Sequence, residues 1–286
     1  MRNALVIARL MIREVLRRRL VFALLALTVL AVLLTTWGFS RLPTIVDDGA
    51  PLPEPTVKLI ASQLLILVMF MFSNVLALSA VFVASPAISG EVESGIALAL
   101  LSRPIARWQY VLGKWLGLAV LVAAYASLAA AVELAAVNAV VDYLPPRPLE
   151  FVAFLIAEGL VLLTFGLLLS TRFSGMVGGV VALVLFGMAW LGGIVGGLGS
   201  AFENDVLERV GTATKLILPT DGLWRGAVYA LEPAAVLAGA LARGPASAAN
   251  PFYAMTPPVP EYLVWCALWL VVVLALAAWS FSRREI

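Results

Sequence analysis

Histidine is absent from the 286-residue sequence, and Cys266 is its single cysteine. The absence of histidine removes the commonest general base and the commonest transition-metal ligand of proteins. A lone cysteine cannot form a disulfide within the chain. A phosphate-binding loop is missing too, because the nearest approach, WQYVLGKW, has Trp108 in place of the first glycine and Trp115 in place of serine or threonine. We therefore expect no catalytic residue, no metal site and no cofactor on this chain.

Charged residues are scarce, at 13% of the chain, while hydrophobic residues make up 63% and the mean hydropathy is +1.03. This balance is typical of a protein embedded in a lipid bilayer. Six apolar runs are long enough to cross a bilayer as helices. They cover about residues 20–39, 59–84, 111–140, 150–170, 175–199 and 262–281. We predict an all-α membrane protein with six transmembrane helices, in a single transmembrane domain over residues 1–286.

Lysine and arginine gather on one side of these six runs. If the N-terminus is inside, 12 of the 19 basic residues fall on the cytoplasmic side. A bias of lysine and arginine toward cytoplasmic loops sets the orientation of a membrane protein. We predict a multi-pass protein of the cytoplasmic (inner) membrane with both termini in the cytoplasm. The net charge of only +2 gives no electrostatic footprint for nucleic acid.

Residues 1–19, which precede the first apolar run, carry an amphipathic pattern. Arginines occupy one side of the predicted helix, and apolar residues recur on the other side at helical spacing. The apolar residues are Ala4, Ile7, Ala8, Met11, Ile12 and Val15. We predict an interfacial helix whose apolar face lies in the membrane and whose basic face meets anionic headgroups. The alternative is a basic flank that only fixes the topology.

Two acidic residues, Glu133 and Glu158, fall inside the third and fourth predicted spans at similar depth. A short turn joins these spans, so we expect the two glutamates to be neighbours. An ionisable residue within a membrane is a candidate for a substrate path. The alternative is a protonated glutamate that bonds to a nearby hydroxyl, amide or carbonyl group and has no transport role.

The fifth run contains nine glycines, several of them four residues apart. Glycine at this spacing lets two helix backbones approach closely within a membrane. The glycines at issue are Gly175, Gly179, Gly192, Gly193, Gly196 and Gly197. They fit helix packing inside one chain and a homodimer face or sliding gate equally well.

Residues 200–261 form the largest predicted segment on the extracytoplasmic side. We predict two short helices there that lie at the outer interface as a lid, within AFENDVLERVGTATKLIL and PTDGLWRGAVYALEPAAVLAGAL. Thr220 or Asp221 can cap the second helix, and Pro233 can bend or divide it.

The cytoplasmic segment over residues 85–110 is polar, in contrast to the spans on either side of it. It contains Gly-Glu-x-Glu-Ser-Gly, then IALALL, then Ser-Arg-Pro, and a Tyr-x-x-x-Lys pair opens the third span. This pattern resembles the segment that links spans two and three in type-2 exporter permeases of the ATP-binding-cassette (ABC-2) family. The matching positions are Gly90, Glu91, Glu93, Gly95, Leu100, Leu101, Ser102, Pro104, Tyr110, Gly113 and Lys114.

The outer sequence LPTDGLWR is similar to a second segment, found in NosY-like permeases, which serve copper-site assembly in nitrous oxide reductase. Pro219, Thr220, Asp221 and Arg225 carry the likeness, and Leu218 stands where those permeases have asparagine.

The ABC-2 resemblance implies a permease subunit that forms a homodimer or pairs with another permease and works with a separate ATPase subunit. ATP and magnesium would then bind to the partner. It also implies that the segment after span two is a coupling helix that enters a groove of the ATPase. The residues in that role would be Gly90, Glu91, Glu93, Ser94, Gly95, Arg103 and Pro104.

The coupling residues suit the implied role physically. Glu91 and Glu93 can pair with basic residues of a partner, Gly90 and Gly95 allow a tight bend, and the short apolar IALALL can fill a groove. A plain interfacial loop is the alternative for the segment. For the whole protein, the alternative is a secondary carrier or membrane scaffold that needs no ATPase.

Overall fold

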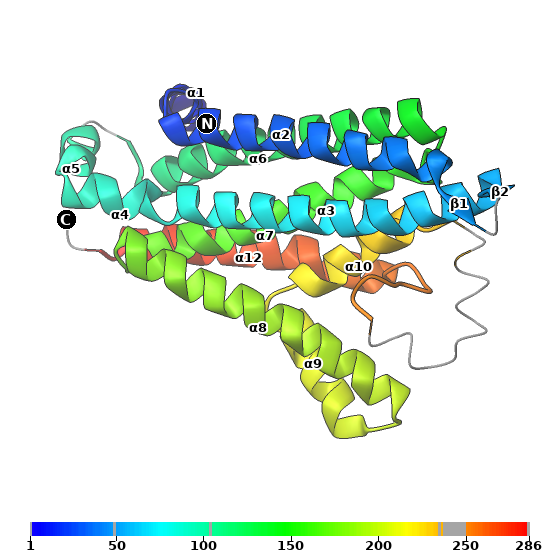
Figure 1. The fold of residues 1–286 in the computed structure, drawn as a ribbon. Helices are drawn as coiled ribbons and strands as arrows, with labels where there is room; N and C mark the ends of the chain where they lie inside the picture. Colours follow the sequence, from blue (N-terminus) through cyan, green and yellow to red (C-terminus); the bar gives the residue numbers. More distant parts are fainter. Residues whose placement is uncertain (1, 48–49, 103–104, 234–235, 237–249, 285–286) are drawn as a thin grey trace.

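A computed structural model describes residues 2–47, 50–102, 105–233, 236 and 250–284 (Figure 1). Six of its helices are long and apolar enough to cross a membrane. They are α2 (Arg19–Arg41), α3 (Glu54–Ala84), α6 (Arg107–Val141), α7 (Pro148–Ser170), α8 (Gly175–Ala201) and α12 (Pro260–Ser282). Each contains one of the six predicted runs, so the prediction of a helical protein with six spans is confirmed.

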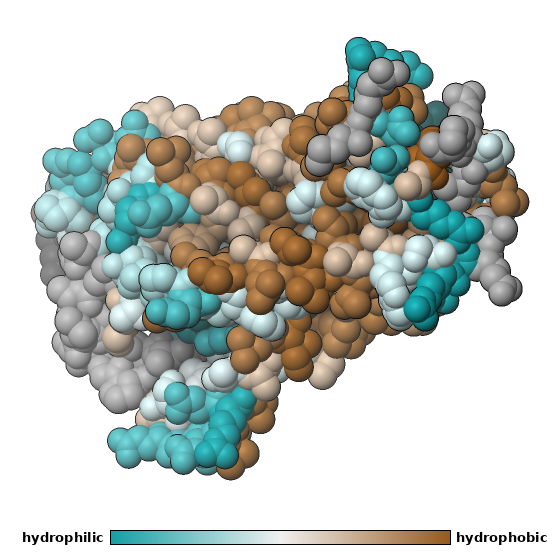
Figure 2. Space-filling view, turned by 180° about the vertical axis from the view of Figure 1, so that it is seen from behind, coloured by the Kyte–Doolittle hydropathy of each residue, from teal (hydrophilic) through white to brown (hydrophobic). Residues whose placement is uncertain are grey.

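The outer surface of the bundle is largely apolar, because the long helices carry hydrophobic residues on nearly all sides. Leu33 on α2, Val132 on α6 and Val264 on α12 are all more than two-fifths exposed. Figure 2 shows a broad apolar band with hydrophilic residues gathered toward the ends of the molecule. This is the surface that a lipid bilayer would cover.

Both termini lie at one end of the bundle (Figure 1). This end, here called the N-terminal end, also carries α1 (Arg2–Leu16), α4 (Pro86–Glu93) and α5 (Ile96–Leu101). The opposite end carries the 3-10 turn η1 (Leu42–Thr44) and the two-residue strands β1 (Val46–Asp47) and β2 (Ala50–Pro51), in which Val46 pairs antiparallel with Pro51. Six spans therefore return the chain to the side on which it begins, as predicted.

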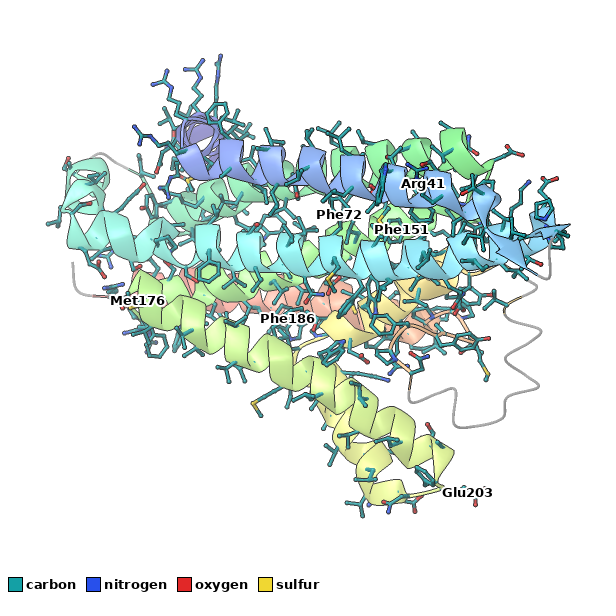
Figure 3. The ribbon with its side chains drawn as sticks, in the orientation of Figure 1. Arg41, Phe72, Phe151, Met176, Phe186 and Glu203 are labelled. Atoms are coloured by element: carbon teal, nitrogen blue, oxygen red, sulfur yellow. The ribbon has the colours of Figure 1, made fainter. Side chains whose placement is uncertain are left out.

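The helix α7 lies at the centre of the bundle and contacts α3, α6, α8, α12 and the short helix α10 (Thr220–Leu231). Its Phe151 is fully buried and lies, with the nearly buried Phe72 of α3, inside the bundle (Figure 3). Aliphatic residues fill the remaining space around α7, among them Leu155, Leu163 and Leu167. The core is thus one continuous apolar interior.

The helix α1 does not use its apolar face as predicted. Met11 is 2% exposed, and this face packs against α6 because α6 has glycines there. A Cβ atom at Gly113 would lie 2.7 Å from the Ala4 carbonyl oxygen, and one at Gly117 would lie 2.7 Å from that of Ala8. The expectation that this face lies in the membrane is therefore wrong. Other apolar residues of α1 are exposed: Leu5, Val6, Leu10 and Leu16.

The helices α8 and α9 (Asp205–Ile217) form an antiparallel arm that leaves the bundle at an angle (Figure 1). Figure 3 shows Glu203 at the tip of this arm and Met176 near its root at the N-terminal end. Asn204 caps α9, because its side-chain oxygen accepts hydrogen bonds from the amides of Val206 and Leu207 at 3.1 and 3.2 Å. The first predicted outer helix is thus present as α9, which packs against α8 in this arm.

Glycines hold the arm together from within one chain. A Cβ atom at Gly196 would lie 2.8 Å from the Cα of Gly211, and one at Gly192 would overlap Thr214. Nearer the root, Gly175 packs on Pro86 and Gly179 on α3. These contacts favour helix packing inside the chain over a dimer face for the glycines of α8.

The second predicted outer helix, α10, lies inside the bundle and not at its surface. Leu223, Trp224, Val228 and Leu231 are at most 2% exposed and pack against neighbouring helices, chiefly α7. Its N-cap is Pro219, without a side-chain cap, so the prediction of a Thr220 or Asp221 cap is wrong. Most of the predicted linker after Pro233 lies outside the described residues.

The close approach of α1 and α6 leads to a stability prediction. Gly117→Leu places a side chain against the α1 backbone, and overpacking of this kind costs roughly 1–3 kcal/mol. We expect a lower thermal unfolding midpoint in detergent, followed by tryptophan fluorescence. Gly187→Leu is the matched control, since a Cβ atom at Gly187 meets nothing within 4 Å. Equal midpoints for the two variants would contradict the packing of α1 on α6.

Candidate functional site

The segment between α3 and α6 forms two short helices at the N-terminal end. The chain passes from α3 through Ser85 into α4 with helical backbone angles, and Pro86 occupies the first turn of α4. Gly95 then takes a φ of 75°, a conformation that glycine adopts without strain, and α5 follows. Gly95 therefore makes the predicted bend. Gly90 does not, because it lies within α4, where a Cβ atom would meet only Pro86, at 3.9 Å.

A buried ion pair ties α4 to the start of α6. The Glu91 carboxylate accepts hydrogen bonds from the Lys114 ammonium and the Tyr110 hydroxyl. Lys114 is 3% exposed and Tyr110 is 1% exposed, so both partners are withdrawn from water. A buried charge of this kind is strongly unfavourable without its partner. The Glu91 carboxylate is thus bonded within the chain. It is not free to pair with a basic residue of a partner protein, as the sequence analysis had suggested.

The opposite side of α4 is fixed to the hairpin between α7 and α8. The Ser170 hydroxyl accepts hydrogen bonds from the amides of Ile88 and Ser89 at 3.0 and 3.1 Å. Gly175 at the start of α8 allows close contact with Pro86. These contacts hold α4 between α6 on one side and α7 and α8 on the other, so that it is clamped to the spans.

The following residues face outward. Glu93 and Ser94 are exposed, and the Ser94 hydroxyl donates to the Gly90 carbonyl at 2.7 Å. On α5, Ile96 and Leu98 are 51% and 53% exposed. Arg103 and Pro104, which were also predicted to couple, lie outside the described residues. The structure therefore divides the predicted site into an anchored part, α4, and a displayed part, Glu93 to α5.

The intramembrane glutamates are not neighbours in the way the sequence suggests. Glu158 faces α3, where its carboxylate accepts a 2.6 Å hydrogen bond from Ser73. Glu133 is fully buried and faces α2, near Thr35. Thr35 itself donates to carbonyls of its own helix, and both Glu133 oxygens lack a hydrogen bond to any described residue. The two groups are thus turned toward different helices.

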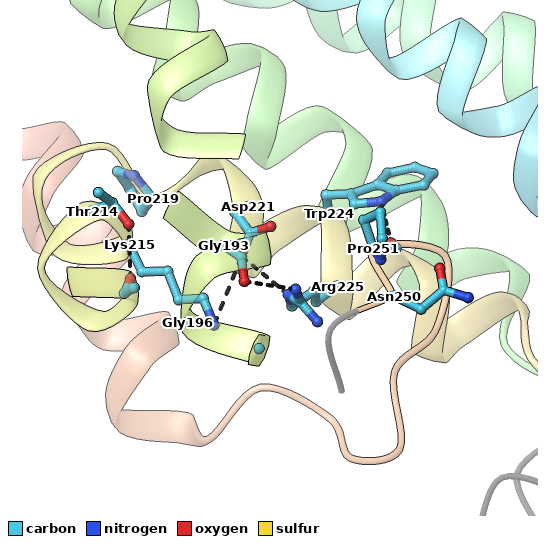
Figure 4. Close-up of polar contacts among 12 residues, drawn as sticks. Gly193, Gly196, Thr214, Lys215, Pro219, Asp221, Trp224, Arg225, Asn250 and Pro251 are labelled. Atoms are coloured by element: carbon cyan, nitrogen blue, oxygen red, sulfur yellow. Dashed lines mark hydrogen bonds and ion pairs between the residues drawn. The ribbon is translucent and has the colours of Figure 1, made fainter. Parts of the chain in front are cut away.

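A second buried charge cluster connects the arm with α10 (Figure 4). Asp221 has no exposed side-chain surface and lies 3.1 Å from Arg225 and 3.7 Å from Lys215. Arg225 also donates to the Gly193 carbonyl of α8 at 3.0 Å. Burial lowers the pKa of Lys215. The segment with the NosY-like pattern therefore builds a junction between α8, α9 and α10.

A cavity of about 280 Å³ opens beside this junction. Lys215 and Arg225 line it, together with Gly197 of α8, which is the last of the six predicted packing glycines. Gly197 thus lies next to the charge cluster of the junction.

The sequence marks Tyr110 and Lys114 as motif positions, but their contact with Glu91 was not predicted. Their spacing of four residues places both side chains on one face of α6, and this spacing could have indicated a shared partner. The Asp221–Arg225 pair has the same spacing. Lys215 belongs to a different helix, and no local pattern could have joined it to Asp221.

These features define a membrane-embedded helical protein: six candidate spans, a clamped helix α4 followed by a displayed helix α5, and two clusters of paired charges. The family model described as "ABC-2 family transporter protein" matches residues 5–286, nearly the whole chain. The chain therefore belongs to the ABC-2 transporter family, whose members are membrane permease components of ABC transporters. No curated protein is significantly similar to it.

The C-terminal end of α10 carries a buried acid, Glu232, with no exposed surface. Its two carboxyl oxygens lie 3.4 Å from the Ala254 amide. Arg147 donates to the Tyr229 carbonyl at 2.9 Å, and Tyr143 donates to that of Leu231 at 3.1 Å. Burial raises the pKa of Glu232 to about 7, although the Ala254 amide and the Arg147 charge oppose the change.

This raised pKa predicts a pH-dependent stability. The folded state keeps the Glu232 proton up to about pH 7, whereas the unfolded state releases it near pH 4.5. Stability from this group is therefore fully present below pH 4.5 and is lost as the pH rises through 7, by up to about 3 kcal/mol. Thermal unfolding at pH 5 and pH 8 should show a smaller difference in Glu232→Gln than in the unmodified protein. The exposed Glu261→Gln is the control, and an unchanged difference in Glu232→Gln would contradict the assignment.

Proposed function

We propose that this protein is the permease subunit of an ABC exporter and that a separate ATPase subunit drives it through α4 and α5. Membership of the ABC-2 family supports a permease role. The observation that carries the proposal further is the division of residues 85–102 into an anchored helix and a displayed one. A coupling element must be rigidly joined to the spans and must also expose a surface to its partner.

The displayed surface suits a groove on a soluble protein. Ile96 and Leu98 present apolar side chains on a helix of six residues, and the exposed Glu93 precedes them. An apolar helix face that inserts into a groove is a common mode of recognition. In this proposal Glu93 pairs with a basic residue of the ATPase, whereas Glu91 serves the permease itself.

Closure of the ATPase upon binding ATP and magnesium would displace α5. Because α4 continues α3 and is bonded to α6 through Glu91, the displacement would pass to both spans as a rigid-body movement. We propose alternating access in two paired permease chains, with both termini in the cytoplasm of a cell that holds the protein in its cytoplasmic membrane. In that orientation substrate leaves toward the extracytoplasmic side.

Within this proposal the buried carboxyls have different roles. Glu133 has no hydrogen bond to any described residue, which makes it the stronger candidate for contact with substrate. Glu158 is bonded to Ser73 and fixes α7 against α3. The path would then lie on the side of α6 that faces α2.

The docking surface can be tested by photo-crosslinking in the native host. A benzophenone amino acid at Ile96 or Leu98 should cross-link to a protein that mass spectrometry identifies by its Walker motifs. Val132, which is 44% exposed on the lipid-facing side of α6, is the matched control position and should give no such product. Glu93→Lys should lower the cross-linking yield several-fold without changing the thermal unfolding midpoint.

Two outcomes would contradict the proposal. In the first, positions 96 and 98 cross-link only to lipid while the chain still supports transport. In the second, the ATPase cross-links equally well from Val132, which would show that α5 is not a specific docking surface. The first outcome would favour a secondary carrier or a scaffold.

A further inference from the structure

An apolar groove of about 280 Å³ runs between α2, α3 and α6 at the N-terminal end of the bundle. Leu24, Ala80, Val122 and Leu128 are among its lining residues, and α1 closes one end with Val15 and Leu16. Leu25 and Leu128 are 39% and 58% exposed, so the groove reaches the lipid-facing surface. Its lining is aliphatic except for Ser79 and Tyr125, which suits a hydrocarbon ligand.

The groove remains unfilled because α2 stands away from the core. The most apolar 18 residues of the first span contain no buried residue. Thr28 of α2 and Tyr125 of α6 share a 2.7 Å hydrogen bond, and Tyr125 also lines the groove. This bond fixes α2 on α6 beside the groove, so the gap belongs to the folded structure.

Three consecutive arginines, Arg17 to Arg19, lie where α1 turns into α2, between the groove-lining residues Leu16 and Val21. Arg18 is paired with Glu14 at 2.5 Å. Arg17 and Arg19 are exposed and form no ion pair with any described residue. Two positive charges without an ion pair to a described residue therefore lie in the turn between Leu16 and Val21, which line the groove.

The length of the groove corresponds to one leaflet. From Leu118 to Leu128, which both line the groove, α6 rises about 15 Å at 1.5 Å per residue. The hydrocarbon core of a bilayer is about 30 Å thick, so one leaflet provides about 15 Å. Cationic side chains at headgroup level above an apolar groove of leaflet depth are complementary to an anionic amphiphile.

We propose that this groove binds one acyl chain of an anionic phospholipid from the leaflet at the N-terminal end, with its phosphate on Arg17 and Arg19. The proposal requires only that the chain lies in a membrane, which its six spans support, and it is independent of the ATPase and of the transported substrate. The bound lipid would fill the space between α2 and the core and hold the α1–α2 corner at the membrane surface.

Native mass spectrometry of the delipidated full-length protein in detergent can test this site. The probes are phosphatidylglycerol and phosphatidylcholine with identical chains. In Arg17→Gln/Arg19→Gln we expect the dissociation constant of the first bound phosphatidylglycerol to rise roughly twenty-fold. Each arginine near an anionic lipid contributes about fivefold to the affinity. Arg9→Gln/Arg13→Gln removes the same amount of charge from α1, away from the α1–α2 turn, and should change the affinity less than twofold.

A second pair of variants tests the groove itself. Ala124 is exposed and lines the groove, so Ala124→Trp should fill it and weaken the binding of both lipids while leaving the thermal unfolding midpoint unchanged. Val132→Trp, on the same helix and outside the groove, should have no effect. If Ala124→Trp does not fold, Leu128→Phe fills the same space.

Three results would overturn the proposal. Equal effects of the two arginine pairs would indicate a diffuse attraction to the surface of α1. Loss of binding in Ala124→Trp with no dependence on Arg17 and Arg19 would indicate an uncharged hydrophobic occupant. No effect of Ala124→Trp on either lipid would indicate ordinary annular lipid without a site.

Discussion

The buried pair between Glu91 and Lys114 is the interaction on which the rest of the arrangement depends. It joins a helix that leaves the membrane at the end of span two to the first turns of span three, with Tyr110 as the third member. The Lys114 charge is unstable there alone, because Lys114 is almost fully removed from water. The pair therefore requires that α4 stay clamped, which gives α5 a fixed place from which to meet a partner.

The other end of the protein uses a comparable device. Asp221, Arg225 and Lys215 form a buried cluster where α8, α9 and α10 meet, and glycines of α8 let the neighbouring helices approach closely. Between the two clusters the bundle is apolar, apart from a few groups such as Glu133 and Glu158. Polar interactions thus fix the ends of the helices, while only a few hydrogen bonds, such as those of Ser73 with Glu158 and Thr28 with Tyr125, join the spans within the apolar interior.

Much of the fold follows from local sequence. Hydropathy and length were sufficient for the six spans, and a glycine between two helical patterns located the bend at Gly95. Hydropathy does not reveal whether an apolar face meets lipid or protein, and this is why α1 and α10 were misplaced at the interface. The role of Glu91 was also missed, because its partner lies 23 residues away and the contact depends on the direction in which α4 leaves the membrane. The glycines of α8 were recognised as packing residues, but the sequence could not show whether they pack within the chain or against a second chain. That became clear only from the structure, in which α9 runs back along α8.

Glu91 and Lys114 stabilise the fold as a pair. A double-mutant cycle with Glu91→Gln, Lys114→Met and the combined variant, followed by thermal and denaturant unfolding in one detergent, measures that coupling directly. We expect Glu91→Gln to cost about 3 kcal/mol or more, because it leaves the buried Lys114 charge unpaired, and the combined variant to cost clearly less than the sum of the two single changes. Additive losses, within about 0.5 kcal/mol, would show that the two side chains act independently and would contradict the clamp.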